Sequence, residues 1–521
     1  MLARTLMIQG TASSVGKSLL VTGLCRMFQR EGVRVAPFKS QNMALNSYVT
    51  PDGHEIGRAQ AVQAEAARVV PTVDMNPILL KPEGDSRSQV VVLGKPIGSM
   101  FARDYHAHKP ELRRIVAESL TRLRETYDLV VIEGAGSPAE INLKDRDIVN
   151  MHVARVADAP VLLVGDIDRG GVFAAFVGTM ELLEPDERAR IAAFVVNKFR
   201  GDIALLEPGL DFLRKRTGVP VLGVVPYVAR LRVADEDSVA LDDRRRRPRA
   251  SADQIEIAVI RLPRISNYDD FAPLEHERDV VVRFVDEPSA MASADLVILP
   301  GTKSTIADLA WLRAGGLAEA LVRRAREGHP VVGICGGCQM LGGIIEDPFG
   351  AESAVVSSVG LELLPIRTRF ERTKTTAQVK ARGRGASILT SGPGDGDLDG
   401  YEIHMGTVEA LEPGCAAFEI CARNSREQRA LDGAVAAGGA VVGTMIHGLF
   451  ENDRLRSRLV AALRGKKGLP EFGPAPAPWS KDAEYDRVAD AIGASIDRGL
   501  LERIVRGERL HERTSHGTEE P

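Results

Sequence analysis

Short apolar runs that end in polar or glycine-rich turns recur along the whole chain and are its main structural signal. In the first half they cover residues 6–8, 127–132, 160–164 and 192–196. In the second half they cover residues 255–260, 294–299, 330–334 and 440–446. Runs of this length that are apolar throughout are typical of strands buried on both faces of a parallel sheet. The pattern therefore predicts an α/β protein whose polar turns gather at one edge of each sheet.

Helices are expected after two of these runs and near the end of the chain. Residues 19–28 follow the first run, and residues 339–345 follow the run at 330–334. After a proline-rich stretch at 470–478, apolar residues repeat at helical spacing between 483 and 505. This spacing predicts a single tail helix packed on the body of the protein, with disorder after residue 506.

The length of 521 residues exceeds that of most single domains. Residues 242–253 contain four consecutive arginines and no apolar residue able to build a core. A basic patch for nucleic acid or membrane is one interpretation, but the acidic flanks favour a solvated linker. We therefore expect one domain at 1–241, a second domain at 254–460, and a helical extension with a tail at 461–521.

Composition narrows the classes of function. A formal net charge of −4 shows no excess of positive charge of the kind that nucleic-acid-binding proteins carry. No apolar run approaches the roughly 18 residues of a membrane span, and we expect no signal peptide before the first strand. Five cysteines, of which we predict Cys335 to act as a free thiolate, fit a reducing cytosol. We expect a cytoplasmic enzyme acting on small molecules, with no nucleic acid or membrane partner and with oligomerisation left open.

The turn after the first strand has the composition of a phosphate-binding loop. Gly10 and Thr11 open a run of small residues that ends with Gly16, Lys17 and Ser18 at a helix start. Backbone amides of such a loop surround phosphate, while the lysine neutralises its oxygens and the serine hydroxyl binds Mg²⁺. Gly10 lies six residues before Gly16, one more than in the common pattern. The loop predicts a site for ATP and Mg²⁺.

A carboxylate and a dense polar block accompany this loop. Glu133 directly follows the run at 127–132, so we expect it near the phosphates as a metal ligand or water holder. Residues 37–47 and 52–61 are rich in polar side chains with little charge alternation. Such a composition suits a substrate-facing loop better than a solvated helix face.

In the second half, Cys335 occupies the tip of a glycine-rich turn between a strand and a helix. A helix N-terminus lowers a thiol pKa, and its amides face a developing oxyanion. Cys338 completes a Cys-x-x-Cys motif, but the other three cysteines offer no second pair, which disfavours zinc and redox roles. We predict Cys335 as the nucleophile and His447, after the run at 440–446, as its base, although a lone histidine there is more often structural.

The motif Gly-x-Cys-x-Gly-x-Gln around Cys335, with His447 downstream, resembles the class I glutamine amidotransferases. In that family the cysteine hydrolyses glutamine through a thioester and releases ammonia. The strand and turn that lead to Thr302 resemble the oxyanion loop of the family. The resemblance implies that the amides of Thr302 and Gly336 stabilise the oxyanion and that Gln339 helps to bind glutamine.

One departure from the family pattern concerns the orienting carboxylate. Most such domains carry a glutamate two residues after the histidine, where this chain has Gly448 and Leu449. A Cys-His dyad is therefore expected, with Glu402 or Glu451 as substitutes that spacing does not establish. The departure is typical of the cobyrinic and cobyric acid branch of the family.

The first half resembles the dethiobiotin synthetase and MinD-like branch of P-loop proteins. The extended loop and the Glu-Gly-Ala-Gly run that begins at Glu133 carry this resemblance. It implies a mostly parallel sheet in the N-terminal domain and an α/β amidotransferase-like C-terminal domain. It also implies that Asn197 contacts the nucleotide base, with a surface cap as the alternative, and that Lys39 contacts phosphate or carboxylate.

From about residue 7 to residue 452, the chain resembles the cobyrinic and cobyric acid branch. The resemblance implies ATP- and glutamine-dependent amidation of the b, d, e and g carboxylates of adenosylcobyrinic acid a,c-diamide to give adenosylcobyric acid. One alternative is amidation of cobyrinic acid at its a and c carboxylates, by an enzyme that usually lacks the block at 39–47. An alternative of another class is a MinD-like ATPase switch that carries an inert amidase-like domain.

Overall fold

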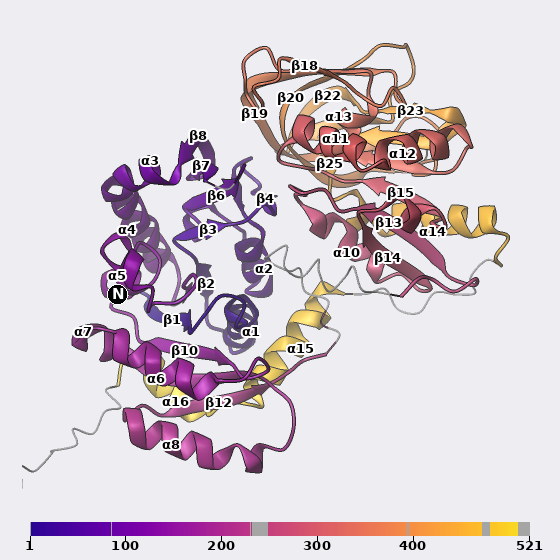
Figure 1. Cartoon of the computed structure of the whole chain (residues 1–521). Coiled ribbons are helices and arrows are strands. Elements are labelled where there is room, and N and C mark those ends of the chain that lie inside the picture. The colour runs from indigo at the N-terminus through magenta and orange to yellow at the C-terminus, as the bar shows by residue number, and fades with distance from the viewer. Residues whose placement is uncertain are drawn as a thin grey trace, which may run out of the picture.

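The computed structural model describes residues 2–84, 86–229, 231, 248–392, 394, 396–470 and 480–508. The chain forms two lobes, the first indigo to purple and the second red to orange (Figure 1). Part of the expected linker at 242–253 lies outside the described residues, as do most of the proline-rich stretch and the chain after residue 508. Both lobes contain a mainly parallel sheet, which confirms the predicted α/β fold class.

The first lobe is built on a sheet of six parallel strands. These are β1 (Arg4–Gly10), β2 (Val35–Phe38), β9 (Leu129–Glu133), β10 (Val161–Asp166), β11 (Ile191–Phe199) and β12 (Val221–Pro226). Their order in the sheet is β12-β11-β10-β1-β9-β2. Alternate residues face opposite sides, so Leu6 and Ile8 enter one core and Met7 the other. Every apolar run expected in this half belongs to this sheet.

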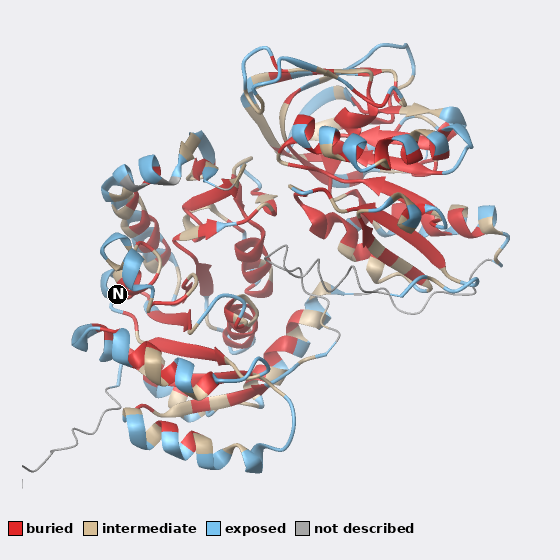
Figure 2. Cartoon of the chain, viewed as in Figure 1, coloured by how far each residue is buried: buried red, intermediate tan, exposed pale blue. Residues whose placement is uncertain are grey.

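Helices cover both faces of this sheet. One face packs against α1 (Lys17–Arg30), α15 (Lys481–Gly493) and α16 (Arg498–Val505). The other packs against α4 (Lys109–Thr126), α5 (Met151–Ala157), α6 (Val172–Leu182) and α8 (Glu207–Thr217). The other α-helices described in this lobe are α2 (Arg58–Ala66), α3 (Ala102–Ala107) and α7 (Pro185–Arg188). Figure 2 shows the strands as buried and the outer surfaces of α4 and α8 as largely exposed.

The tail differs from its prediction. Instead of one helix at 483–505 there are two, because Ile496 pairs with Gly223 of β12 between them. Helix α15 lies against α1 of the first lobe, where the buried Arg26 binds Asp486 at 2.8 Å. The expected boundary at residue 460 falls inside α14 (Asp453–Lys467), which packs on the second lobe. The chain therefore leaves the first lobe, forms the second and returns (Figure 1).

The polar block at 37–61 forms short strands on two small sheets. One contains β3 (Gln41–Met43), β6 (Ile78–Pro82), β7 (Arg87–Val92) and β8 (Lys95–Phe101), and the other contains β4 (Ser47–Val49) and β5 (Glu55–Gly57). Gln41 and Asn42 line a cavity of the first lobe, in line with a substrate-facing loop. Lys39, Met43 and Ala59 of the block line the same cavity. Ser47, Glu55 and Arg58 instead contact the second lobe, which corrects the prediction for these three residues.

The second lobe has its own mainly parallel sheet. Its strands are β13 (Ile255–Ile260), β14 (Val280–Val285), β15 (Leu296–Leu299), β16 (Val331–Ile334), β23 (Ala434–Ala436) and β24 (Val441–Thr444). Their order is β14-β13-β15-β16-β24-β23, with only β23 antiparallel to its neighbour. The helices include α10 (Ala272–Glu275), α11 (Thr305–Ala314), α12 (Leu317–Arg326) and α13 (Gly336–Leu341). Helix α13 was expected at 339–345, but it starts directly after Cys335 and ends before two glycines.

A second, mostly antiparallel sheet in this lobe was not predicted from the sequence. It consists of β17 (Ile344–Glu346), β18 (Ser357–Val359), β19 (Ile366–Gly383), β20 (Leu398–Ala410), β21 (Phe418–Arg423), β22 (Arg426–Asp432) and β25 (Ile446–His447). Only Met445 separates β24 from β25, so the chain crosses between the two sheets at this point. His447 pairs with Tyr401 of β20 and therefore lies on the antiparallel sheet.

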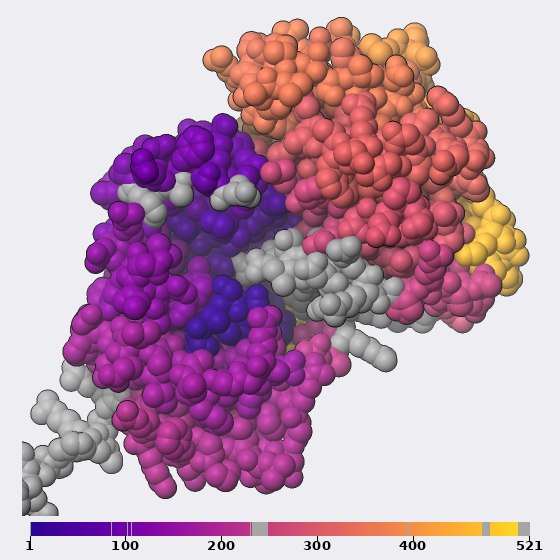
Figure 3. Space-filling model, viewed as in Figure 1, coloured from indigo at the N-terminus to yellow at the C-terminus, as the bar shows by residue number. Residues whose placement is uncertain are grey.

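The two lobes touch each other (Figure 3), and buried polar contacts join them. Glu55 of the first lobe has no exposed side-chain surface and binds Lys81 at 2.7 Å and Lys374 of the second lobe at 2.5 Å. The Thr376 hydroxyl donates to the carbonyl of Gly53 at 2.7 Å. Each charge buried in such a contact is stabilised by its partner, because removing one partner leaves an unpaired buried charge. The interface therefore holds the lobes in a defined arrangement.

Candidate active sites

The Cys335 turn has the strained geometry of a nucleophile elbow. Cys335 joins β16 to α13 with φ 52° and ψ −113°, a conformation that non-glycine residues rarely adopt. A Cβ on Gly337 would lie 1.9 Å from the carbonyl oxygen of Leu299, so only glycine permits this close approach. The Cys335 amide donates to the carbonyl of Thr444 at 2.8 Å. These contacts fix the sulfur at the N-terminus of α13.

Cys338 has a structural environment. It is fully buried against Gly443, and burial, the charge of Asp432 and the neighbouring Cys335 raise the pKa of its thiol. Within the described ranges, no group of three or more His, Cys, Asp or Glu side chains forms a metal site. The geometry therefore supports Cys335, and not the Cys-x-x-Cys pair, as the reactive element.

Asp270 supplies the carboxylate beside His447. Its Oδ2 lies 2.6 Å from Nδ1 of the ring, and its Oδ1 accepts the Gly448 amide at 2.9 Å. Tyr401 stacks on the imidazole with ring centroids 5.2 Å apart. Burial lowers the pKa of His447, but the charges of Asp270 and Cys335 outweigh it and raise the pKa to about 10. The site is thus a candidate Cys335-His447-Asp270 triad, where a dyad was expected.

The two glutamates suggested from the sequence have other partners. Glu402 binds Arg423 through two hydrogen bonds of 2.5 and 3.0 Å. Glu451 binds Lys481 at 2.9 Å. Neither carboxylate is available to orient His447, so both suggestions are wrong. The sequence feature that could have identified the carboxylate partner of His447 is the Asp269-Asp270 pair. It follows β13 and therefore lies at the same sheet edge as Cys335.

The residues expected around the oxyanion lie beside the nucleophile. The backbone nitrogen of Thr302 is 3.1 Å from the position that a Cβ on Gly336 would occupy, so the two amides are neighbours. The Thr302 hydroxyl donates to Asp308 at 2.5 Å and accepts the Ser304 amide at 3.1 Å, which fixes the loop. Gln339 is buried, with its side-chain amide between the Thr305 hydroxyl and the Met405 carbonyl. Its expected role in binding glutamine stays a prediction.

The phosphate-binding loop connects β1 to α1. Gly16 has φ 97°, which favours glycine, and a Cβ on Gly10 would lie 2.6 Å from Val15. The Thr11 amide donates to the carbonyl of Val164 at 2.9 Å. The Lys17 ammonium donates at 3.1 Å to the carbonyls of Ala12 and Gly136, across the mouth of the loop.

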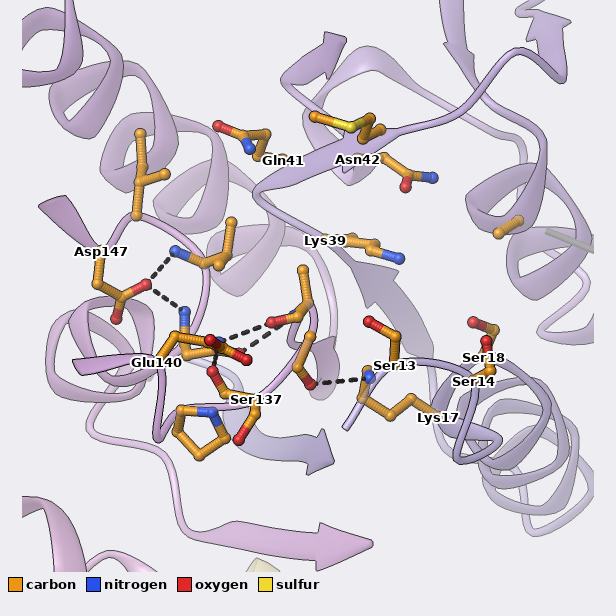
Figure 4. A pocket seen from close by; sticks show the side chains of 18 of the residues that line it. Ser13, Ser14, Lys17, Ser18, Lys39, Gln41, Asn42, Ser137, Glu140 and Asp147 are labelled. Atoms are coloured by element: carbon orange, nitrogen blue, oxygen red, sulfur yellow. Dashed lines mark hydrogen bonds between the residues drawn. The ribbon is translucent and has the colours of Figure 1, made fainter. Parts of the chain in front are cut away.

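A cavity of about 780 Å³ opens beside this loop. Its lining includes Gly16, Lys17, Ser18 and Lys39, and all the lining residues come from the first lobe. Figure 4 shows Lys17, Ser18 and Lys39 near one another, with Gln41 and Asn42 above them. A site of this volume with several converging cationic and hydroxyl groups suits a phosphate-bearing ligand.

Glu133 is the centre of a buried polar cluster behind the cavity. Its Oε1 accepts from the Ser18 hydroxyl at 2.8 Å and from the Lys39 ammonium at 2.9 Å, and its Oε2 accepts from Gln63 at 2.5 Å. A hydroxyl and a carboxylate oxygen side by side fit Mg²⁺, which takes one or two protein oxygens besides phosphate and water. Ser18 and Glu133 would hold the ion, with Lys39 as a competing cation.

Asn197 lies against the loop and is absent from the cavity lining. Its side-chain nitrogen donates to the carbonyl of Val15 at 2.8 Å. A Cβ on Gly16 would lie 2.2 Å from the same nitrogen. The observed contact supports the loop backbone, so the expected contact with a nucleotide base stays a prediction.

Comparisons with known proteins agree with this geometry. Residues 6–240 match the CobQ/CobB/MinD/ParA nucleotide binding domain, and residues 256–455 match the CobB/CobQ-like glutamine amidotransferase domain. A cobyric acid synthase of Sorangium cellulosum is 69% identical over 97% of this chain and 99% of its own length. A cobyric acid synthase of Dehalococcoides mccartyi is 52% identical over 97% of this chain and 99% of its own length. One of Moorella thermoacetica is 51% identical over 99% of this chain and 100% of its own length.

Fold and sites together define a glutamine amidotransferase fused to a nucleotide-binding domain. This class is the one that the sequence motifs predicted. Within it, the chain belongs to the cobyric acid synthase family, and it is a glutamine-hydrolysing amide ligase of cobyric acid synthesis. Within the described residues, no helix is both long enough and apolar enough to span a membrane.

Proposed function

We propose that this enzyme uses ATP, Mg²⁺ and glutamine to amidate the b, d, e and g carboxylates of adenosylcobyrinic acid a,c-diamide, giving adenosylcobyric acid. A carboxylate resists attack by ammonia because it is a poor electrophile. Two activities are therefore needed, one to activate the carboxylate and one to release ammonia. The chain has a candidate site for each, in separate lobes.

In the second lobe, the Cys335 thiolate attacks the side-chain carbonyl carbon of glutamine. The amides of Thr302 and Gly336 stabilise the oxyanion, and protonated His447 gives its proton to the leaving nitrogen as the C–N bond breaks. Water then hydrolyses the thioester, with His447 accepting its proton, and glutamate leaves. The raised pKa of His447 favours the imidazolium that this sequence begins with. Asp270 holds the ring and stabilises that charge.

In the first lobe, the γ-phosphoryl group of ATP is transferred to an oxygen of the substrate carboxylate. Lys17 and the loop amides neutralise the charge that shifts toward the phosphates. Mg²⁺ held by Ser18 and Glu133 would supply further charge neutralisation. Ammonia then attacks the acyl carbon and phosphate leaves, forming the amide. The Gln41 and Asn42 side chains in the cavity are our candidates for contacts with the corrinoid.

The contact between Asp270 and His447 is the observation that carries this proposal, because it gives the proposed base the carboxylate partner that a catalytic triad requires. An inert amidase-like domain on an ATPase switch would have no need of this contact. All five cysteines are free, which supports the cytoplasmic location that we propose.

The test is incubation with ATP, Mg²⁺, glutamine labelled with ¹⁵N in its side chain, and candidate corrinoids, followed by mass spectrometry. We expect four labelled amides on adenosylcobyrinic acid a,c-diamide. Two amides on cobyrinic acid would identify the earlier a,c-amidation instead. ATP hydrolysis without any amide would favour the switch. The Cys335→Ala variant should lose amidation from glutamine and keep amidation from ammonium chloride.

A further inference from the structure

Helix α2 links the two candidate sites. It starts with Arg58 at the second lobe, and five residues later it carries Gln63, which donates to Glu133 beside the phosphate-binding loop. At 1.5 Å per residue, these contacts are separated by only about 7.5 Å along the helix axis. All residues of α2 except Glu65 are buried, so a displacement at one end of the helix is passed to its other end through packed contacts.

Arg58 binds the residue next to the triad carboxylate. Its Nε lies 2.9 Å from Oδ2 of Asp269, and both side chains are at least nine-tenths buried. Asp269 immediately precedes Asp270, which orients His447. Two adjacent buried carboxylates repel each other, and a buried cation from the other lobe offsets that repulsion. Without Arg58, Asp269 would be left as an unpaired buried charge.

Two further contacts hold the same segment from the first lobe. The Ser47 amide donates to the side-chain oxygen of Asn267 at 3.0 Å. The Tyr268 amide donates to the side-chain oxygen of Asn46 at 3.2 Å. The turn that carries the triad carboxylate is therefore held by the lobe that carries the nucleotide cavity. An amidase domain alone would lack these three contacts.

We propose that α2 couples the two sites, with Arg58 as a positioning residue for the Asp270-His447 pair and Gln63 as its link to Glu133. Occupation of the cavity changes what Glu133 binds, and a shift of α2 changes how Arg58 holds Asp269. Such coupling makes glutamine hydrolysis faster when ATP and corrinoid are bound, so that ammonia is released when an acceptor is present. The inference rests on the proposed function of both sites.

The test measures glutamate release, with and without ATP, Mg²⁺ and adenosylcobyrinic acid a,c-diamide, in full-length variants. We expect Arg58→Met to lower kcat for glutamine hydrolysis by roughly 10- to 100-fold, the scale of a misplaced catalytic group. The KM for glutamine and the ammonia-dependent amidation should stay near wild type. Arg58→Lys, which keeps the charge, should restore part of kcat. Gln63→Leu should keep basal hydrolysis and lose the stimulation by ATP and corrinoid.

A double-mutant cycle distinguishes positioning from general damage. If Arg58 acts through Asp269, the combination of Arg58→Met with Asp269→Asn should cost no more than the worse single variant. The matched control is Thr376→Val, which removes another hydrogen bond between the lobes and should change neither basal nor stimulated hydrolysis. The proposal would be overturned if the losses of kcat in the two single variants multiply in the double variant. It would also be overturned if Arg58→Met and Gln63→Leu both keep the wild-type kcat and the wild-type stimulation. Absence of glutamine hydrolysis in the wild type would instead refute the proposed function.

Discussion

Oδ2 of Asp270 lies 2.6 Å from Nδ1 of His447, although 177 residues separate them in the chain. The contact forms because Asp270 follows β13 and His447 follows the crossing from β24 to β25, at the same edge of the second lobe. Asp432 fixes this crossing by accepting from the Thr444 hydroxyl at 2.5 Å and the Met445 amide at 3.0 Å. The amidase site is thus assembled from segments that are distant in sequence.

Asp270→Asn should lower the rate of glutamine hydrolysis by about 10²- to 10⁴-fold, because the ring loses both its orientation and its stabilising charge. The charge of Asp270 raises the pKa of His447, so its loss should lower that pKa from about 10. Activity that needs the imidazolium falls as pH rises through this pKa. The alkaline limb of the pH-rate profile should therefore move to lower pH, as measured by glutamate release.

Glu277→Gln is the control for this prediction. It removes a carboxylate that lies seven residues after Asp270 and binds Arg456 at 2.8 Å. Its pH profile should match the wild type. An unchanged profile for Asp270→Asn, or an equal shift for Glu277→Gln, would contradict the assignment of Asp270.

The two cysteines of the motif should differ in reactivity. Iodoacetamide should alkylate Cys335 and inactivate glutamine hydrolysis, because the thiolate is the nucleophile. Cys338 should stay unmodified in the folded enzyme, because burial and nearby negative charge raise its pKa. Peptide mapping by mass spectrometry would check this, and early labelling of Cys338 would show that our assignment is wrong. Prior incubation with glutamine should slow the alkylation of Cys335.

Glu133→Gln should abolish amidation from glutamine and from ammonium chloride alike. The substitution removes the negative charge that Ser18 and Lys39 contact, and with it one of the two proposed Mg²⁺ ligands. Amide formation with ammonium chloride should fall by at least about 100-fold, as expected for lost charge stabilisation at a phosphoryl-transfer site. Normal amidation from ammonia in this variant would exclude Glu133 from the chemistry.

Gly23 and Gly178 give a matched pair that tests the packing of α15 on α1. A Cβ on Gly23 would lie 2.3 Å from Ile492 and 2.8 Å from Val488, whereas nothing lies within 4 Å of one on Gly178. Gly23→Ala should destabilise the protein by about 1–3 kcal/mol through overpacking. Gly178→Ala, in helix α6, should be neutral or stabilising by up to about 1 kcal/mol. Thermal unfolding should show a lower Tm for Gly23→Ala and an unchanged or higher Tm for Gly178→Ala, and similar shifts would refute the tight contact.

Sequence patterns identified the features that depend on neighbouring residues. The strand, loop and helix around Lys17 and the turn at Cys335 are local, so spacing and residue type were sufficient to predict them. Asp270 was missed because it lies 177 residues from His447 in the chain, and no residue pattern near His447 identifies so distant a partner. The antiparallel sheet was missed because the long strands β19 and β20 are largely polar on one side. Arg58 was expected in a substrate loop because polar composition cannot distinguish a ligand site from an interface between lobes.

The return of the chain to the first lobe has a consequence for synthesis on the ribosome. Helices α15 and α16 complete one face of the first sheet, yet they are translated after the whole second lobe. Until then, the side of α1 that includes Gly23 and Met27 lacks part of its cover. Domains generally fold in the order in which they emerge. Here the domain that starts first finishes last, so nascent chains stopped before residue 480 should bind chaperones that recognise exposed apolar surface.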